Sequence, residues 1–193
     1  MFNFFQILNY IDDIKKIDLT HLKNYATNTH WLFQNKGEHY KLLAFLSSKL
    51  KNETIFDIGT YEGNSALALA LGENKVVSYD IINCRTIKSK PNNIEFVIGD
   101  FRNDSKILSS PLILIDVDPH DGIKEKEFHE FFISNNYKGV VLWDDIYFND
   151  AMRNWWNSIK DDSVVKFDLS SIGHHSGTGM IVYGLEGLRE PRE

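Results

Sequence analysis

The sequence has a single cysteine, Cys84, among its 193 residues. One cysteine excludes an internal disulfide framework and a cysteine-rich zinc module, and it is compatible with a reducing cytosol. We therefore expect a cytoplasmic protein. No base partner accompanies Cys84 in the sequence, so we expect it to pack behind the loop that carries it rather than to act as a nucleophile.

Long apolar runs are also missing, since no stretch approaches the roughly 20 residues that span a bilayer. The first residues lack the basic region and the small-residue cleavage site of a signal peptide. We interpret residues 1–16 as an amphipathic helix with Phe4, Phe5, Leu8 and Ile11 on its apolar face. We expect that helix to pack on the domain or on a second subunit in preference to a membrane.

Positive charge is in short supply, because 21 Lys and Arg stand against 27 Asp and Glu, a net charge of -6. Proteins that bind nucleic acid through its phosphates need a clustered positive field. The balance argues against a general polyanion binder, although it does not exclude a local basic groove.

Between residues 37 and 160, helical stretches alternate with β-rich runs. Several runs are apolar on consecutive residues, as strands buried on both faces of a parallel sheet require. The runs are 54–58, 75–79, 94–98, 111–115 and 138–143. The helical stretches are 37–50, 63–72, 122–135 and 149–160. The alternation predicts an α/β fold with a doubly wound, mostly parallel sheet of seven strands.

The last two predicted strands, 163–173 and 178–184, are joined only by residues 174–177. That connection leaves no room for a helix, so the two strands should form an antiparallel hairpin. We divide the chain into a helical extension (1–36), a single α/β domain (37–185) and a disordered tail (186–193).

Each of the five predicted parallel strands ends in at least one carboxylate. In such sheets, ligands bind beyond the carboxyl ends of the strands. A single Asp there is weak evidence, because Asp is common in loops. Several acids on one edge would repel one another, so we expect hydroxyl donors, a cationic ligand or a metal to offset them. The acids are Asp57, Asp80, Asp100, Asp116, Asp118, Asp144 and Asp145.

The loop after the first strand carries Gly59 and Gly63, which allow a tight turn and a close approach of the next helix. The dinucleotide pattern G-x-G-x-x-G and the phosphate loop G-x-x-x-x-G-K-[ST] are both absent. Asp80 lies about 20 positions beyond the first strand, as does the acid that binds a ribose diol in dinucleotide-binding folds. These features favour a nucleoside-type cofactor without a pyrophosphate cradle.

At this point the sequence resembles the class I S-adenosylmethionine (SAM)-dependent methyltransferases, over about residues 37–183. FDIGTYEGNSALALA is similar to their first motif, YDI to the second, GDF to the third, and LILIDVD with VVLWDD to the fourth and fifth. The subgroup it most resembles is the macrocin O-methyltransferase-like set of small-molecule O-methyltransferases. The resemblance implies the Rossmann-like methyltransferase fold.

The same resemblance assigns cofactor contacts along the strand ends. Four residues would wrap the methionine part of SAM, namely Gly59, Thr60, Tyr61 and Gly63. Asp57 would hold its amino group, and Asp116 would lie near that amine and the acceptor. Asp80 would bind the ribose hydroxyls, with Ile81 on the adenine. Asp100 would accept the adenine amino group, with Phe101 beside the ring.

The resemblance also implies a magnesium site formed by Asp116, Asp144 and Asp145, whose oxygens suit that ion. The alternative is that Asp144 or Asp145 caps the loop. Related metal-dependent enzymes often carry Asp-Asn where this chain has Asp144-Asp145. The catechol-type enzymes place a lysine base where this chain has Pro119.

His120 is our preferred general base, with Asp116 as the other catalytic candidate. A loop histidine bonded to backbone is an equal alternative for His120. His174 and His175 could serve at the same edge, although packing in their turn is favoured. Trp143, Trp155 and Trp156 could line an acceptor pocket, but the helical spacing of the last two favours core packing.

We therefore expect a SAM-dependent enzyme that methylates a hydroxyl of a small molecule such as a sugar or a glycosylated metabolite. Methylation of nucleic acid is an alternative, against which stand the negative charge and the missing Asn/Asp-Pro-Pro-aromatic motif. A non-catalytic binding module is another. Residues 1–36 would shape the acceptor pocket or a homodimer contact.

Overall fold

The structure is a computed structural model that describes residues 2–33, 38–160 and 162–184. The predicted tail, 186–193, lies outside the described residues. Within the described residues, no helix is both long enough and apolar enough to cross a membrane.

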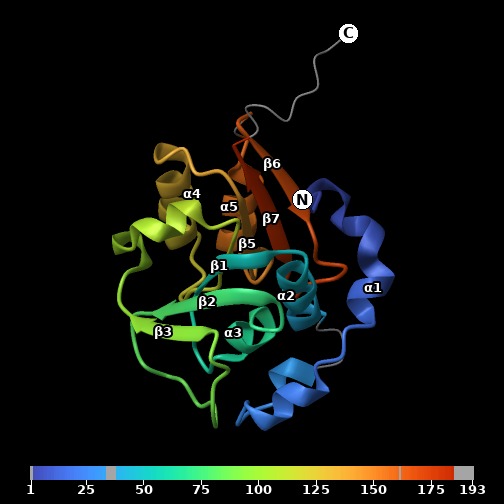
Figure 1. Cartoon of the computed structure of the whole chain (residues 1–193). Helices are drawn as coiled ribbons and strands as arrows, with labels where there is room; N and C mark the ends of the chain where they lie inside the picture. Colours follow the sequence, from blue (N-terminus) through green and yellow to red (C-terminus); the bar gives the residue numbers. More distant parts are fainter. Residues whose placement is uncertain (1, 34–37, 161, 185–193) are drawn as a thin grey trace.

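One seven-stranded sheet forms the centre of the molecule (Figure 1). Its strand order is β3-β2-β1-β4-β5-β7-β6, and the first five strands in the sequence run parallel. The strands are β1 (Lys51–Ile58), β2 (Glu73–Asp80), β3 (Ile94–Ile98), β4 (Leu112–Ile115), β5 (Val140–Asp144), β6 (Val164–Asp168) and β7 (Thr178–Tyr183). The chain order reverses between β1 and β4, which makes that junction the switch point where open α/β sheets bind ligands.

The expected terminal hairpin is confirmed. Strand β7 pairs antiparallel with both β5 and β6, which places β6 at the edge of the sheet. The predicted doubly wound α/β sheet of seven strands is likewise confirmed, with β1 and β2 beginning a few residues earlier than their apolar runs indicate.

Two hydrophobic layers cover the two faces of the sheet. One layer holds α2 (His39–Ser48) and α3 (Asn64–Leu69) against residues such as Leu112 and Leu114. The other holds α4 (Ile123–Ser134) and α5 (Asp150–Ser158) against Ile113 and Ile115. Because side chains of a strand alternate between faces, a strand buried on both sides must be apolar at every position, as β4 is.

The predicted core packing of Trp155 and Trp156 is confirmed, and Trp143 lies in the core as well. Trp143 is fully buried on β5, and its ring centroid lies 5.0 Å from that of Trp155 on α5. Trp156 is also buried. Cys84 is a free, half-buried cysteine in the loop after β2.

The amino-terminal segment packs on the domain beside α2 (Figure 1). It consists of a 3-10 helix, η1 (Phe4–Tyr10), α1 (Ile11–Lys15), and the short 3-10 helices η2 (Thr20–Asn24) and η3 (Trp31–Phe33). Two further short 3-10 helices, η4 (Phe101–Asn103) and η5 (Ser105–Ser109), lie between β3 and β4.

The apolar face predicted for residues 1–16 is wrong for Phe5 and Leu8, which are exposed. The fully buried residues are instead Ile7 and Ile14. The reason is the 3-10 geometry, in which residues three apart eclipse, so that Ile7 shares a face with Phe4 rather than with Leu8.

We predict that Ile7→Ala lowers the free energy of unfolding by about 2–4 kcal/mol, because the substitution leaves a cavity between η1 and the domain. Leu8→Ala, at an exposed neighbouring position, should change it by no more than about 0.5 kcal/mol. Urea denaturation of both variants measures the difference. Equal effects of the two substitutions would contradict the observed packing.

Candidate functional site

Asp57, Asp116, Asp144 and Asp145 lie near one another beside the switch point between β1 and β4. The Gly59 N–H donates to Tyr79 O at 2.8 Å, and the Asp116 N–H donates to Ile58 O at 2.8 Å, so these bonds hold the ends of β2, β1 and β4 in register. Gly59 has φ 98°, and a Cβ there would lie 1.5 Å from Asp116 O. Only glycine fits this turn.

Asp57 lies beneath this junction and is fully buried. Its Oδ2 accepts a 2.6 Å hydrogen bond from Ser78 Oγ, which is itself 2.6 Å from Thr60 Oγ1. Asp57 Oδ1 has no hydrogen-bond partner among the described residues. Burial raises the pKa of Asp57 to about 6, against the opposing effects of the Ser78 and Ser65 hydroxyls. One oxygen of a buried carboxylate thus remains unsatisfied, a costly arrangement that a cationic ligand would relieve.

Asp80, at the end of β2, holds the loops around it. Its carboxylate accepts from Tyr61 N at 2.9 Å and from Ile82 N at 3.2 Å. Tyr61 and Ile81 are 61% and 74% exposed, so large apolar side chains stand unburied on either side of Asp80. Gly63 adopts φ 94° and begins α3.

Asp100 and Phe101 are both engaged within the protein. The Arg102 guanidinium donates to both oxygens of Asp100 and, with burial opposing it, holds the pKa of Asp100 below its ordinary value. Phe101 is buried in an edge-on contact with Phe128 of α4, with ring centroids 4.8 Å apart. The structure therefore places Phe101 in the core.

Beyond β4 and β5, carboxylates and imidazoles form two adjoining clusters that share Asp145. One consists of Asp116, His120 and Asp145, and the other of Asp144, Asp145 and His174. Within each cluster, the potential ligand atoms lie within 4.8 Å of one another. The three acids predicted to bind magnesium are thus brought together, although they are divided between two clusters that each include a histidine.

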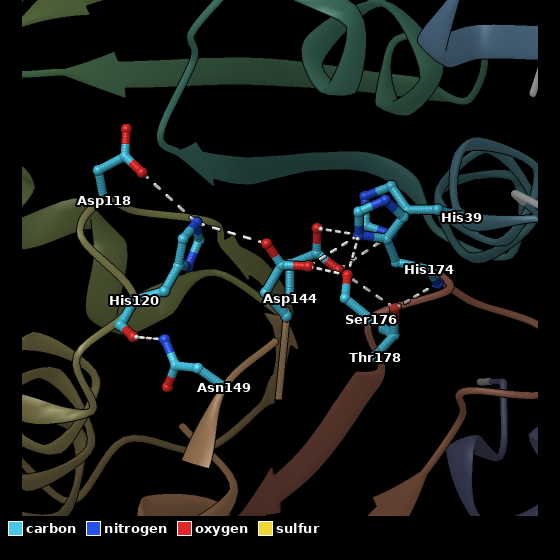
Figure 2. A network of polar contacts seen from close by, with 9 residues as sticks. His39, Asp118, His120, Asp144, Asn149, His174, Ser176 and Thr178 are labelled. Carbon is cyan, nitrogen blue, oxygen red and sulfur yellow. Dashed lines mark hydrogen bonds and ion pairs between the residues drawn. The ribbon is translucent and has the colours of Figure 1, made fainter. Parts of the chain in front are cut away.

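The His120 side chain lies between two carboxylates, as Figure 2 shows. Its Nε2 is 3.4 Å from Asp145 Oδ2 and 3.6 Å from Asp118 Oδ1. Asn149 Nδ2 donates to His120 O at 2.8 Å and fixes the loop. Both His120 and Asp145 have positive φ, 55° and 59°, which is uncommon outside glycine and frequent at functional sites.

His174, in the turn between β6 and β7, contacts the acids from the other side (Figure 2). Its Nδ1 lies 2.9 Å from Asp145 Oδ1 and 3.3 Å from Asp144 Oδ2, and Ser176 Oγ also donates to Asp145. Although burial opposes it, hydrogen bonding to the two carboxylates raises the pKa of His174 to about 10. His175, beside it, is exposed.

The pKa values of Asp116 and Asp144 shift in opposite directions. Burial and the charges of Asp144 and Asp145 raise the pKa of Asp116 well above its ordinary value. The pKa of Asp144 is lowered, because His39 and His174 together outweigh its burial. The positive charge of His174 opposes the rise in the pKa of Asp116 but does not cancel it.

Two site residues on α2 were not identified from the sequence. His39 is buried with its Nδ1 3.6 Å from Asp144 Oδ1, beyond hydrogen-bond reach, and burial lowers its pKa. Tyr40 lies in the field of the acids, since burial together with Asp116 and Asp144 raises the pKa of its hydroxyl. Neither residue belongs to a motif, and Tyr40 fits an apolar helix face.

Comparison with known proteins identifies the architecture. No family model matches the sequence, and no curated protein matches it. The structure is similar to cofactor-bound Rv0187 from MTB (TM-score 0.55, 15% identity, covering 92% of this chain and 87% of that one). It is also similar to the SAH-bound methyltransferase PaMTH1 of Podospora anserina (TM-score 0.52, 15% identity, 92% and 87% covered). A third similar structure is the SAH complex of a Bacillus cereus O-methyltransferase (TM-score 0.52, 16% identity, 92% and 89% covered).

The chain has the Rossmann-like methyltransferase fold. These structures share its mostly parallel sheet, flanking helices and antiparallel terminal hairpin. The fold expected from the sequence is confirmed, whereas the likeness to the macrocin O-methyltransferase-like subgroup remains a prediction.

The His174 pKa yields a pH prediction. Because folding raises it from 6.5 to about 10, protonated His174 stabilises the folded state fully below about pH 6.5, and this contribution is lost as the pH rises toward 10. In metal-free buffer, the stability of the wild type should therefore fall from pH 7 to pH 10 more steeply than that of His174→Gln. Urea denaturation over this range gives the free energy of unfolding of both proteins as a function of pH. Parallel curves would contradict the raised pKa of His174.

Proposed function

We propose that the chain is a SAM-dependent methyltransferase that transfers a methyl group to a hydroxyl of a small molecule, with assistance from magnesium. The observation that carries this proposal is the unpaired oxygen of buried Asp57 at the switch point of the sheet. SAM carries an ammonium and a sulfonium, so it offers the positive charge that this edge lacks. Cofactor- and SAH-bound proteins of the same fold support the choice of ligand.

Each part of SAM has a complementary group along the edge. Asp57 and the loop of Gly59, Thr60, Tyr61 and Gly63 would hold the methionine part. Asp80 would accept hydrogen bonds from the ribose hydroxyls. The exposed Ile81 would pack on the adenine, where burying an apolar side chain that is 74% exposed is favourable. Asp100 would reach the adenine amino group only by sharing its carboxylate with Arg102.

A divalent ion is compatible with the acids beyond β4 and β5. Asp116 and Asp145 each offer a carboxylate oxygen, and these oxygens lie within 4.8 Å of one another. Oxygen-rich ligand sets suit magnesium. Asp144, the third acid of the proposed site, lies 3.3 Å from His174 Nδ1 and 3.6 Å from His39 Nδ1. When bound, the ion would polarise the acceptor oxygen and lower the pKa of its hydroxyl.

The residues of the chain have separate tasks in the transfer. His120 Nε2 would accept the proton of the acceptor hydroxyl, and Asp145 would stabilise the imidazolium formed. Asp116 would orient the acceptor and the methionine amine. SAM supplies the methyl carbon when bound. The fold would align the acceptor oxygen, that carbon and the sulfur. Holding reacting atoms in this geometry lowers the activation barrier of the displacement.

We assign the remaining parts of the chain by their place around this edge. Residues 37–185 form the cofactor-binding domain in this proposal. Residues 1–36 shape the acceptor side or a homodimer contact, because they lead directly into α2, which carries His39 and Tyr40.

Calorimetry with SAM and with S-adenosylhomocysteine, with and without magnesium, tests whether the chain is a SAM-dependent enzyme. We expect saturable binding of both, weakened about 10- to 100-fold in Asp80→Asn, which loses a charged hydrogen-bond acceptor. Asp150→Asn, at an exposed acid on α5, is the matched control and should bind normally. Absence of binding under all conditions would eliminate the proposal. Transfer of labelled methyl to a panel of small hydroxyl compounds then tests the reaction.

The pKa of Asp57 predicts how SAM affinity depends on pH. Since that pKa is about 6, affinity should be constant above about pH 7 and should fall toward tenfold per pH unit below pH 6, as the carboxylate that binds the ammonium becomes protonated. Asp57→Asn should bind weakly at every pH. Calorimetry from pH 5 to pH 8 provides the measurement. A wild-type affinity that does not change over this range would show that Asp57 does not bind the ammonium of SAM.

A further inference from the structure

Phe148 is an exposed aromatic residue beside the candidate base. Its side chain is 59% exposed, and its ring centroid lies 5.3 Å from that of His120. The turn that carries it is fixed, because the Phe148 N–H donates to Asp145 O at 2.9 Å and Asn149 bonds His120 O. The exposed face of this ring therefore offers an aromatic surface to a molecule that reaches His120.

Asp118 borders His120 on another side. Its side chain is 93% exposed, and its Oδ1 lies 3.6 Å from His120 Nε2. Figure 2 shows His120 between Asp118 and the acids at the end of β5. The rim around His120 thus combines a free carboxylate with an aromatic face. An ammonium group is attracted both to a carboxylate and to an aromatic face.

The loops on this side of the site contain no Lys or Arg, and the positive charge of His174 among them is paired with Asp144 and Asp145. Residues 59–63, 116–122, 145–149 and 169–177 include no Lys or Arg. They carry Glu62, Asp116, Asp118, Asp121 and Asp145. The cationic residues near the strand ends lie instead after β2 and β3, where Arg85 covers Phe96 and Arg102 binds Asp100. The acceptor side therefore has a negative potential that favours cations and repels phosphates and carboxylates.

We infer that the methyl acceptor is a hydroxyl compound carrying a positively charged amine, which Phe148 and Asp118 bind while its hydroxyl faces His120. This inference rests on the proposed function and narrows its substrate class. It adds no covalent step, because the amine is bound and unchanged. The bond that forms joins the acceptor oxygen to the methyl carbon, the bond that breaks is carbon to sulfur, and the hydroxyl proton passes to His120.

A pair of isosteric probes isolates the effect of charge. Choline carries a hydroxyl and a permanent positive charge, and 3,3-dimethylbutan-1-ol has the same shape without the charge. 3-Hydroxypropanoate serves as the anion. On protein saturated with S-adenosylhomocysteine, ligand-observed NMR titration should show choline binding at least about tenfold tighter than its neutral isostere, and the anion binding weakest.

Two substitutions locate that preference. Asp118→Asn and Phe148→Leu should each reduce the choline-to-isostere ratio about three- to tenfold, while binding of the neutral isostere changes little. Asp150→Asn and Phe5→Leu are matched controls. Asp150 has a 92% exposed side chain, and Phe5 is an exposed aromatic residue in the amino-terminal segment, distant in sequence from Phe148. Both should keep the wild-type ratio.

The outcomes separate the two proposals. If S-adenosylhomocysteine does not bind, both the proposed function and this inference fail. If it binds but choline shows no advantage over its isostere, or no probe binds, only the inference is overturned. A choline preference that survives in both Asp118→Asn and Phe148→Leu overturns the assignment of these residues.

Discussion

Repulsion among carboxylates gathered at one edge of the sheet is the constraint around which this structure is organised. The parallel strands carry their acids to the same edge, and most of these acids are stabilised by a neighbouring donor. Asp57 is held by a serine hydroxyl, Asp80 by backbone N–H groups and Asp100 by a guanidinium. Asp144 and Asp145 share the imidazole of His174. Asp116 receives no comparable donor among the described residues, and its carboxyl accordingly has a strongly raised pKa. Of the acids considered at this edge, Asp116 beside the switch point is therefore the one whose charge is least compensated within the protein.

The parts of this arrangement that follow from backbone periodicity could be predicted from the sequence. Consecutive apolar residues in β4 and β5 require burial on both faces, and a parallel sheet requires its strand ends to coincide. The parallel sheet and the convergence of Asp116, Asp144 and Asp145 follow from those two requirements, and the hairpin follows from the short connection 174–177. Gly59 was identifiable for a similar reason, because a tight turn at a strand end favours a residue without a side chain.

The parts that depend on tertiary contact could not be predicted in this way. His39 and Tyr40 reach the acids only because α2 packs where it does, and nothing in their local sequence distinguishes them from a helix face. The 3-10 geometry of η1 shifts the buried face from Leu8 to Ile7, which a period of 3.6 residues does not anticipate. Phe101 begins the short 3-10 helix η4 and packs in the core against Phe128, whereas the family resemblance implied a place beside the adenine ring. In each case the competing effect is packing against an element distant in the sequence.

Asp145 belongs to both acidic clusters, and this sharing has a thermodynamic consequence. Its Oδ2 faces His120 while its Oδ1 faces His174 and Ser176, on opposite sides of one carboxyl group. Any cation that engages Oδ2 withdraws electron density from Oδ1 and weakens the hold on the His174 proton. By reciprocity, the protonation of His174 must weaken cation binding on the His120 side by the same free energy. The charge state of His174 in the β6–β7 turn, which is remote in sequence from β4, thereby affects how strongly a cation binds on the opposite side of Asp145.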